Sequence, residues 1–148
     1  MKEQFKITLN ASREKVWDAL FTDQNYRYWT SVFAEGSWVD TTWQKGSKAL
    51  FLDSKNDGMS SVIEENIPSE FLSIRHMGTV LKGEEYLNRP EDDEWRGGHE
   101  NYTLKESHGK TELTVDLEFG DIGEKMVHYF KETWPKALDL LKAIAEKN

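Results

Sequence analysis

Apolar and polar residues alternate at the start of the chain and then recur at helical spacing. Residues 3–9 alternate, with Phe5, Ile7 and Leu9 on one face, the period of two that a half-buried β-strand produces. After this strand, apolar residues recur every three or four positions as far as Phe21, which predicts a helix. Ser12 is placed to cap its N-terminus. A second short helix follows and carries Tyr26 and Trp29. This part of the chain therefore predicts one strand and two short helices.

From Gly36 onward the pattern changes to short runs of strand-forming residues separated by turn residues, which is typical of an antiparallel meander. The segment 56–58, Asn-Asp-Gly, is a strong hairpin signal because these residues tolerate positive φ. The predicted strands cover residues 37–40, 48–53, 59–66, 71–77, 100–106 and 111–119.

One long connection, residues 78–98, separates two of these strands and contains a proline, a charge cluster and paired glycines. Connections of this length without secondary structure are usually functional lids or mobile segments. We interpret its acidic run, residues 91–94, as a solvated surface. A Ca²⁺ site would need oxygen ligands at regular spacing with a glycine among them.

An amphipathic pattern over residues 122–146 predicts a helix about 37 Å long, with Asp121 and Glu124 placed as a capping pair. Pro135 interrupts the pattern, at a cost of about 3 kcal/mol in a helix interior. Two interpretations stay open. Either Thr133 caps a new helix after a break, or one helix is kinked at the proline and its apolar stripe follows a curved sheet.

Four stretches fit a known pattern: FKITLNASREKVWDALFTDQNYRYW at 5–29, PSEFLSIRHMG at 68–78, ENYTLKESHGKTELTVDL at 100–117 and WPKALDLLK at 134–142. With these stretches and its order of strand, two helices, six strands and long helix, the chain resembles the START-like, helix-grip superfamily, also called SRPBCC or birch-pollen-allergen-like. Within it the chain is similar to the branch named for activators of the heat-shock protein 90 ATPase. The resemblance implies an α+β fold in which a curved antiparallel seven-stranded sheet wraps the C-terminal helix, as one domain over residues 1–148. The segment 78–98 departs from the common pattern.

Composition narrows the range of partners. With 19 basic and 27 acidic residues the formal charge is -8, which repels nucleic acid and anionic membrane surfaces. Cysteine is absent, and no stretch approaches the length of a membrane span or the apolar core of a signal peptide. We therefore expect a cytoplasmic protein with no metal site and no cofactor, whose oligomeric state the sequence leaves open. The six tryptophans must fill a core or line a site.

In the superfamily the space between helix and sheet is often a cavity for a hydrophobic ligand, and the resemblance implies the same here. Strand alternation and the helical stripe then suggest its walls. The alternative is that these side chains touch one another and fill the space. The proposed walls are Leu72, Ile74, Tyr102, Leu104, Leu113, Val115, Leu117 and Phe119 from the sheet, and Phe130, Trp134, Leu138 and Leu141 from the helix.

Two polar residues fall on the apolar face of their predicted strands. His76 follows Leu72 and Ile74 at two-residue spacing, and Glu100 precedes Tyr102 at the same spacing. A buried imidazole or carboxylate needs a partner, so we expect the two to pair with each other or to meet a ligand. The alternative is that both lie at strand ends and reach water. His76 and Glu100 are also the candidate catalytic residues, as an acid–base pair in a dry pocket.

Three functions are compatible with these patterns. The preferred hypothesis is a binding protein that encloses a small apolar or aromatic molecule. The second is a chaperone-interaction module in which the acidic surface or segment 78–98 docks on heat-shock protein 90. The third is a cyclase or dehydratase that uses His76 and Glu100. No catalytic motif such as G-x-S-x-G or H-E-x-x-H is present, so the sequence favours binding over catalysis.

Overall fold

Residues 1–147 are described by a computed structural model, which is an α+β fold with the predicted helix-grip architecture. The antiparallel sheet runs in the order β1-β8-β7-β5-β4-β3-β2, with β6 paired to β5. The elements, in chain order, are β1 (Lys2–Leu9), α1 (Arg13–Phe21), α2 (Asp23–Trp29), the 3₁₀ turn η1 (Thr30–Val32), β2 (Trp38–Asp40), β3 (Lys48–Leu52), β4 (Gly58–Ile67), β5 (Phe71–Leu81), β6 (Glu84–Tyr86), the 3₁₀ turn η2 (Pro90–Asp92), β7 (His99–Ser107), β8 (Lys110–Glu118) and α3 (Glu124–Ala145).

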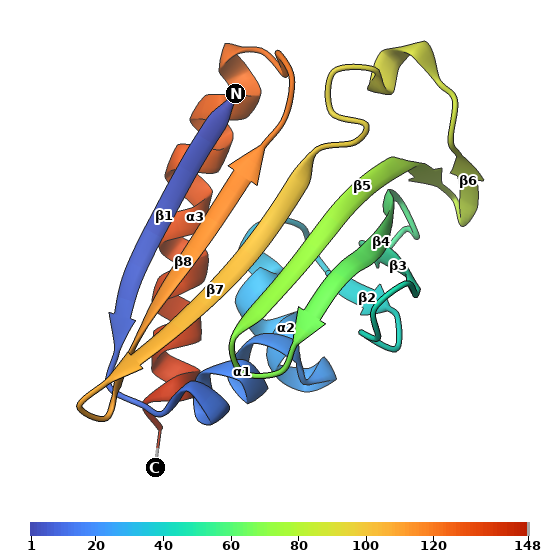
Figure 1. The fold of residues 1–148 in the computed structure, drawn as a ribbon. Helices are drawn as coiled ribbons and strands as arrows, with labels where there is room; N and C mark the ends of the chain where they lie inside the picture. Colours follow the sequence, from blue (N-terminus) through green and yellow to red (C-terminus); the bar gives the residue numbers. More distant parts are fainter. Residues whose placement is uncertain (148) are drawn as a thin grey trace.

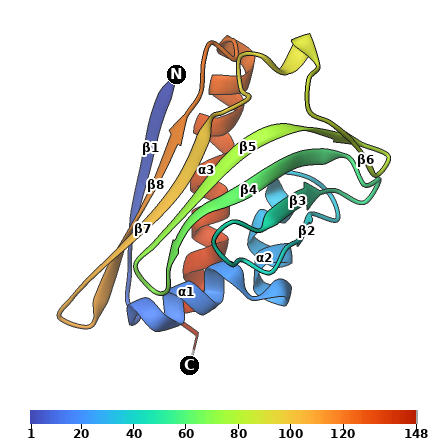
Figure 2. The ribbon, with the colours of Figure 1, turned by 45° about the vertical axis from the view of Figure 1, so that its right-hand side comes forward.

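Helix α3 lies along one face of the curved sheet, while α1 and α2 pack at the end of the molecule where α3 finishes (Figures 1 and 2). The two short helices form as the sequence predicted, with the Ser12 hydroxyl accepting from the Lys15 amide at 3.2 Å to cap α1. The alternating face of β1 packs against the core through Phe5, Ile7 and Leu9. The sheet and α3 therefore enclose the interior of the protein between them.

Residues 78–98 are more ordered than the sequence predicted, because strand-forming residues continue past Met77. β5 extends to Leu81 and turns back into β6. β6 brings the number of strands to eight over the described residues, where seven were predicted. The unstructured connection is shortened to the segment around η2, and the prediction of a long loop was wrong in this respect.

Helix α3 is continuous through Pro135, whose side chain is exposed, so the predicted alternative of a break capped by Thr133 is wrong. The predicted capping pair is also wrong: the N-cap residue is Gly123, at φ 89°, a left-handed conformation that glycine adopts without strain. Asp121 accepts from the Gly123 amide at 3.0 Å instead of capping the helix. A kink at Pro135 remains a prediction.

The two halves of α3 are packed differently. In the second half Ala137, Leu138, Leu141 and Ala145 are buried in the core against the sheet and α1. In the first half Met126 and Tyr129 expose 44% and 38% of their surface. Residues 124–129 therefore lie outside the core, which α3 joins from Phe130 onward. No helix within residues 1–147 is long and apolar enough to cross a membrane.

Candidate ligand cavity

A cavity of about 620 Å³ lies between the sheet and the first half of α3. A volume of this size fits a small organic molecule, and cavities that hold such molecules are mostly apolar with a few polar groups. Exposed residues such as Glu91, Glu94 and Met126 border it, so it reaches the protein surface at one end. Its apolar lining consists of Tyr26, Trp29, Phe33, Ala34, Phe51, Leu52, Met59, Trp95, Tyr102, Leu117, Phe119, Ile122, Met126, Tyr129, Phe130 and Trp134.

Trp134 separates this cavity from the packed core. Its ring lies 5.0 Å from Phe33, 6.0 Å from Trp29 and 6.3 Å from Tyr102, measured between ring centroids, and stacks on Phe5 at 6.0 Å. Only 4% of its surface is exposed. A large buried ring with these contacts packs α3 against β1, α2 and β7 at the inner end of the cavity.

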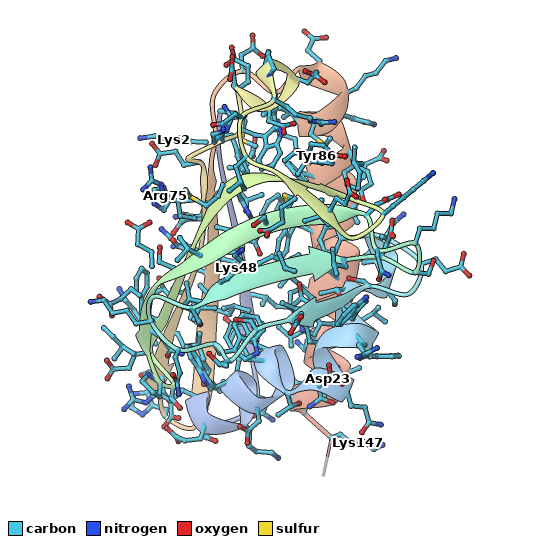
Figure 3. All side chains as sticks on the ribbon, turned by 90° about the vertical axis from the view of Figure 1, so that its right-hand side faces the viewer. Lys2, Asp23, Lys48, Arg75, Tyr86 and Lys147 are labelled. Carbon is cyan, nitrogen blue, oxygen red and sulfur yellow. The ribbon has the colours of Figure 1, made fainter. Side chains whose placement is uncertain are left out.

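On one edge of β5 the partner strand changes close to His76. β5 pairs with β7 from Phe71 to Arg75 and with β6 from Thr79 to Leu81. Between these two stretches the His76 amide donates to the Gly98 carbonyl at 2.9 Å, and the His76 carbonyl accepts from the Gly97 amide at 2.7 Å. Arg75 projects away from α3 (Figure 3), so the neighbouring His76 points inward by strand alternation.

His76 and Glu100 meet inside the cavity, as the sequence predicted for a pair of polar residues in an apolar phase. His76 Nε2 lies 3.4 Å from Glu100 Oε1, and His76 Nδ1 hydrogen-bonds to the Ser61 hydroxyl at 2.7 Å. The His76 ring stacks on Phe119, with 5.7 Å between centroids, and is only 1% exposed. His76 lies within β5, so the alternative that it reaches water at a strand end is wrong.

Glu100 carries a carboxylate into this apolar space. One of its oxygens, Oε2, accepts a hydrogen bond from the Tyr102 hydroxyl. Burial raises the pKa of Tyr102 well above its usual value, and the negative charge of Glu100 raises it further. The pKa of Tyr26 is raised for the same two reasons. Both phenols therefore stay protonated at neutral pH and can donate hydrogen bonds inside the cavity.

The rim of the cavity is held by contacts between segments that are distant in the sequence. The Tyr129 hydroxyl of α3 donates to the Phe33 carbonyl at 2.7 Å. The Gly120 and Asp121 amides donate to the Glu94 carbonyl and carboxylate at 2.7 and 3.0 Å. Segment 87–98 is thereby tied to the start of α3.

Asp92 anchors segment 87–98 to the sheet and corrects the prediction that residues 91–94 are a solvated surface. It is 2% exposed, and its carboxylate accepts from Thr79 at 2.8 Å, from Trp95 at 3.2 Å and from both Nε and Nη2 of Arg89, at 3.1 and 2.9 Å. Burial alone raises the pKa of Asp92, but the hydrogen bonds from Arg89 and Thr79 outweigh it and leave the pKa below its usual value. The other three residues of the run are exposed.

The proposed cavity walls divide into two groups. Seven of the residues proposed from the sequence line the cavity: His76, Glu100, Tyr102, Leu117, Phe119, Phe130 and Trp134. The others pack into the core beyond Trp134 and do not line it: Leu72, Ile74, Leu104, Leu113, Val115, Leu138 and Leu141. The side chains of this second group contact one another and fill the space, which was the alternative to a cavity.

The sequence did not indicate several lining residues. Tyr26, Trp29, Phe51, Met59 and Trp95 line the cavity, although neither strand alternation nor the helical stripe points to them. Their aromatic or flexible side chains were the available signal. Their convergence depends on how β3 and β4 approach segment 87–98, which alternation does not reveal. Among the described residues, no group of three His, Asp or Glu side chains is arranged to hold a metal ion.

The curved sheet, the long C-terminal helix and the cavity between them define a START-like helix-grip protein. The profile of the family described as "Activator of Hsp90 ATPase homolog 1-like protein" matches residues 10–146, and the chain belongs to this family. No functionally curated protein matches it. The family and the fold fit either a ligand-binding module or a module of the Hsp90 ATPase-activator type.

Solved structures share this fold at low sequence identity. The protein MLL2253 from Mesorhizobium loti superposes with a TM-score of 0.77 at 15% identity, covering 97% of this chain and 96% of that one. The Aha1 dimer from Colwellia psychrerythraea gives 0.70 at 22%, covering 99% and 96%. DynU16, described as a putative protein in the dynemicin biosynthetic locus, gives 0.71 at 16%, covering 99% of this chain and 47% of its own. At these identities the likeness concerns the fold.

Proposed function

We propose that this protein binds a small, largely apolar or aromatic molecule in the cavity between the sheet and the first half of α3. The observation that carries the proposal is the cavity of about 620 Å³, lined by aromatic rings with His76 and Glu100 inside it. Burial of ring surface drives such binding, and a few fixed polar groups orient the ligand. DynU16, a neighbour in fold, is a putative protein of a biosynthetic locus, which also fits a small-molecule role.

Blocking the rim tests this proposal. Ala34 lines the cavity and is partly exposed, so Ala34→Trp places a large ring at the opening. We expect the variant to bind a panel of aromatic compounds at least about tenfold more weakly, a loss of about 1.4 kcal/mol. The measurement is quenching of tryptophan fluorescence, supported by the shift in melting temperature that bound ligand produces.

Ala143→Trp is the matched control, because Ala143 is exposed on the second half of α3 and does not line the cavity. It should bind the panel as the wild-type protein does. A wild-type protein that responds to no member of the panel would contradict the proposal. Equal binding by Ala34→Trp and the wild type would place any binding elsewhere.

A chaperone-interaction role is the second candidate, and membership of the family favours it. The acidic rim, which includes Glu91, Glu94 and Asp121, is the surface such a role would use. An Hsp90 ATPase assay with and without this protein tests it. Stimulation that survives Ala34→Trp would assign the activity to the surface, separately from the cavity.

The 3.4 Å separation of His76 and Glu100 keeps a dehydratase-type reaction as a further candidate. Glu100 would take a proton from the carbon next to a ketone, and His76 would protonate the β-hydroxyl as its C–O bond breaks and water leaves. The dehydration of 4-hydroxy-4-phenylbutan-2-one, followed by the ultraviolet absorbance of the conjugated ketone, tests this. No acceleration over Glu100→Gln would count against catalysis.

A further inference from the structure

The charges that line the cavity are of one sign. Among the described residues the lining includes no lysine or arginine, and apart from His76 its ionisable charged side chains are all acidic: Asp53, Asp57, Glu91, Glu94, Glu100 and Asp121. A concave site lined by one sign of charge with low-dielectric walls concentrates ions of the opposite sign. The field in this cavity therefore favours a positively charged occupant.

Most of this negative charge has no basic partner inside the protein. Within residues 1–147, Glu91 lies 3.9 Å from Arg89, and Glu100 faces His76. Asp53, Asp57, Glu94 and Asp121 take part in no ion pair within 4.0 Å over the same range, and those of their carboxylates that form hydrogen bonds accept mainly from backbone amides. Backbone amides position these groups without neutralising them.

The inner end of the cavity points to a ligand independently of the charges. His76 is almost fully buried, and its Nε2 atom has no hydrogen-bond partner within the described chain, although it faces Glu100 Oε1 at 3.4 Å. A buried imidazole nitrogen left unpaired costs free energy unless something else in the site satisfies it. Glu100 Oε1 likewise retains acceptor capacity, because the Tyr102 hydroxyl occupies Oε2.

Aromatic faces surround these polar atoms. Phe119 stacks on His76, and Tyr102 donates to Glu100. The rings of Trp95 and Phe51 lie steeply inclined to the His76 ring, with centroids 6.3 and 6.4 Å from it. Aromatic rings carry negative potential on their faces and attract an ammonium group within about 6 Å, most strongly where water is excluded. Rings and carboxylates in one cavity both favour a cation with an apolar body.

We propose that the ligand is an amphipathic organic cation: an aromatic or alicyclic body seated among the rings, with an ammonium group directed at Glu100. This inference rests on the proposed function and names its ligand class. Carboxylate ligands such as fatty acids are disfavoured, because their charge would face Glu100 and the acidic rim. An ammonium N–H can donate to Glu100 Oε1, and a neutral His76 Nε2 without a proton can accept a second N–H.

Three probes on one ring skeleton test the proposal: 2-naphthylmethylammonium, 2-naphthylmethanol and 2-naphthoate. For the wild-type protein we expect the ammonium to bind about tenfold or more tighter than the alcohol, and the carboxylate to bind most weakly. Calorimetric titration at two salt concentrations measures this. The ammonium affinity should fall as salt rises, because part of it comes from exposed rim charges, whereas the affinity for the alcohol should not.

Glu100→Gln removes the inner charge while it keeps the shape of the side chain and an acceptor for Tyr102. We expect the ratio of ammonium affinity to alcohol affinity, measured within this variant, to fall to about two- to threefold, the part that comes from the rim. Glu112→Gln is the matched control: Glu112 is exposed on β8 and outside the cavity, and this variant should keep the full preference.

The outcomes separate the two proposals. If the alcohol binds and the ammonium binds no tighter in the wild type, the inference about the ligand class is overturned and the binding function stands. If the preference survives unchanged in Glu100→Gln, Glu100 is not the recognition group and the inference is overturned as stated. If none of the three probes, nor the same three groups on an anthracene skeleton, binds at all, the cavity function itself fails.

Discussion

Replacing Trp134 with alanine is expected to lower the free energy of unfolding by about 3–5 kcal/mol, the range for truncation of a large buried aromatic residue. Trp134 is 4% exposed and contacts rings from β1, α2, β7 and the segment after η1. Its removal joins the cavity to a void beside the core, where the lost contacts are not replaced. Urea unfolding followed by far-ultraviolet circular dichroism measures the change.

Trp134→Phe is the matched control, because it keeps one ring of the stack at the same position. We expect it to lose less than half as much stability as Trp134→Ala. A loss below about 1 kcal/mol in Trp134→Ala would show that the ring does not hold α3 and the sheet together, and the separation of cavity from core would have to be explained otherwise.

Replacing Asp92 with alanine is expected to lower the free energy of unfolding by about 1–3 kcal/mol, because Thr79, Trp95 and Arg89 lose the acceptor they share. Segment 87–98 should also exchange its backbone amides with solvent faster, which mass spectrometry of its peptides detects. The adjacent residue Asp93 is the control. It is exposed and pairs with Arg96, so Asp93→Ala should change stability by about 0.5 kcal/mol or less. Equal effects in the two variants would contradict the role assigned to Asp92.

The lowered pKa of Asp92 gives the same contact a pH dependence. Because the folded-state pKa lies below the unfolded value of about 3.9, the charged carboxylate stabilises the fold above that pH. That contribution is lost as the pH falls from about 4 through the folded-state pKa. The difference in stability between the wild type and Asp92→Asn should therefore be constant from pH 5 to 7 and shrink below pH 4. A difference that grows on acidification would contradict this assignment.

The fold could be predicted from the sequence because its main elements carry local signals. The alternation in β1, the Ser12 cap of α1 and the apolar stripe of α3 each correspond to an observed element. β6 could not be predicted, since its three residues are stable only through pairing with β5. The N-cap of α3 was predicted wrongly, because Gly123 at positive φ provides it where an acidic pair was expected.

The inner polar pair of the cavity could also be predicted, whereas most of the cavity's outline could not. His76 and Glu100 share the phase of their apolar neighbours, and alternation alone turns both inward. Whether Leu138 or Met126 borders the cavity depends on where Trp134 packs between α3 and the sheet, which is a tertiary property. The burial of Asp92 could not be predicted, because its partners Thr79, Arg89 and Trp95 are brought together by the β5–β6 hairpin and the segment that follows it.

The four methionines of the chain allow the most direct test of the account's central claim, that small molecules bind between the sheet and the first half of α3. Met59 and Met126 line the cavity on opposite sides, while Met1 and Met77 do not line it. The protein is labelled with ¹³C at the methionine methyl groups, titrated with 2-naphthylmethanol and followed by proton–carbon NMR spectra. The account predicts ring-current shifts at Met59 and Met126 that saturate together, with Met1 and Met77 unchanged; shifts confined to Met1 or Met77, or none at any of the four, would contradict it.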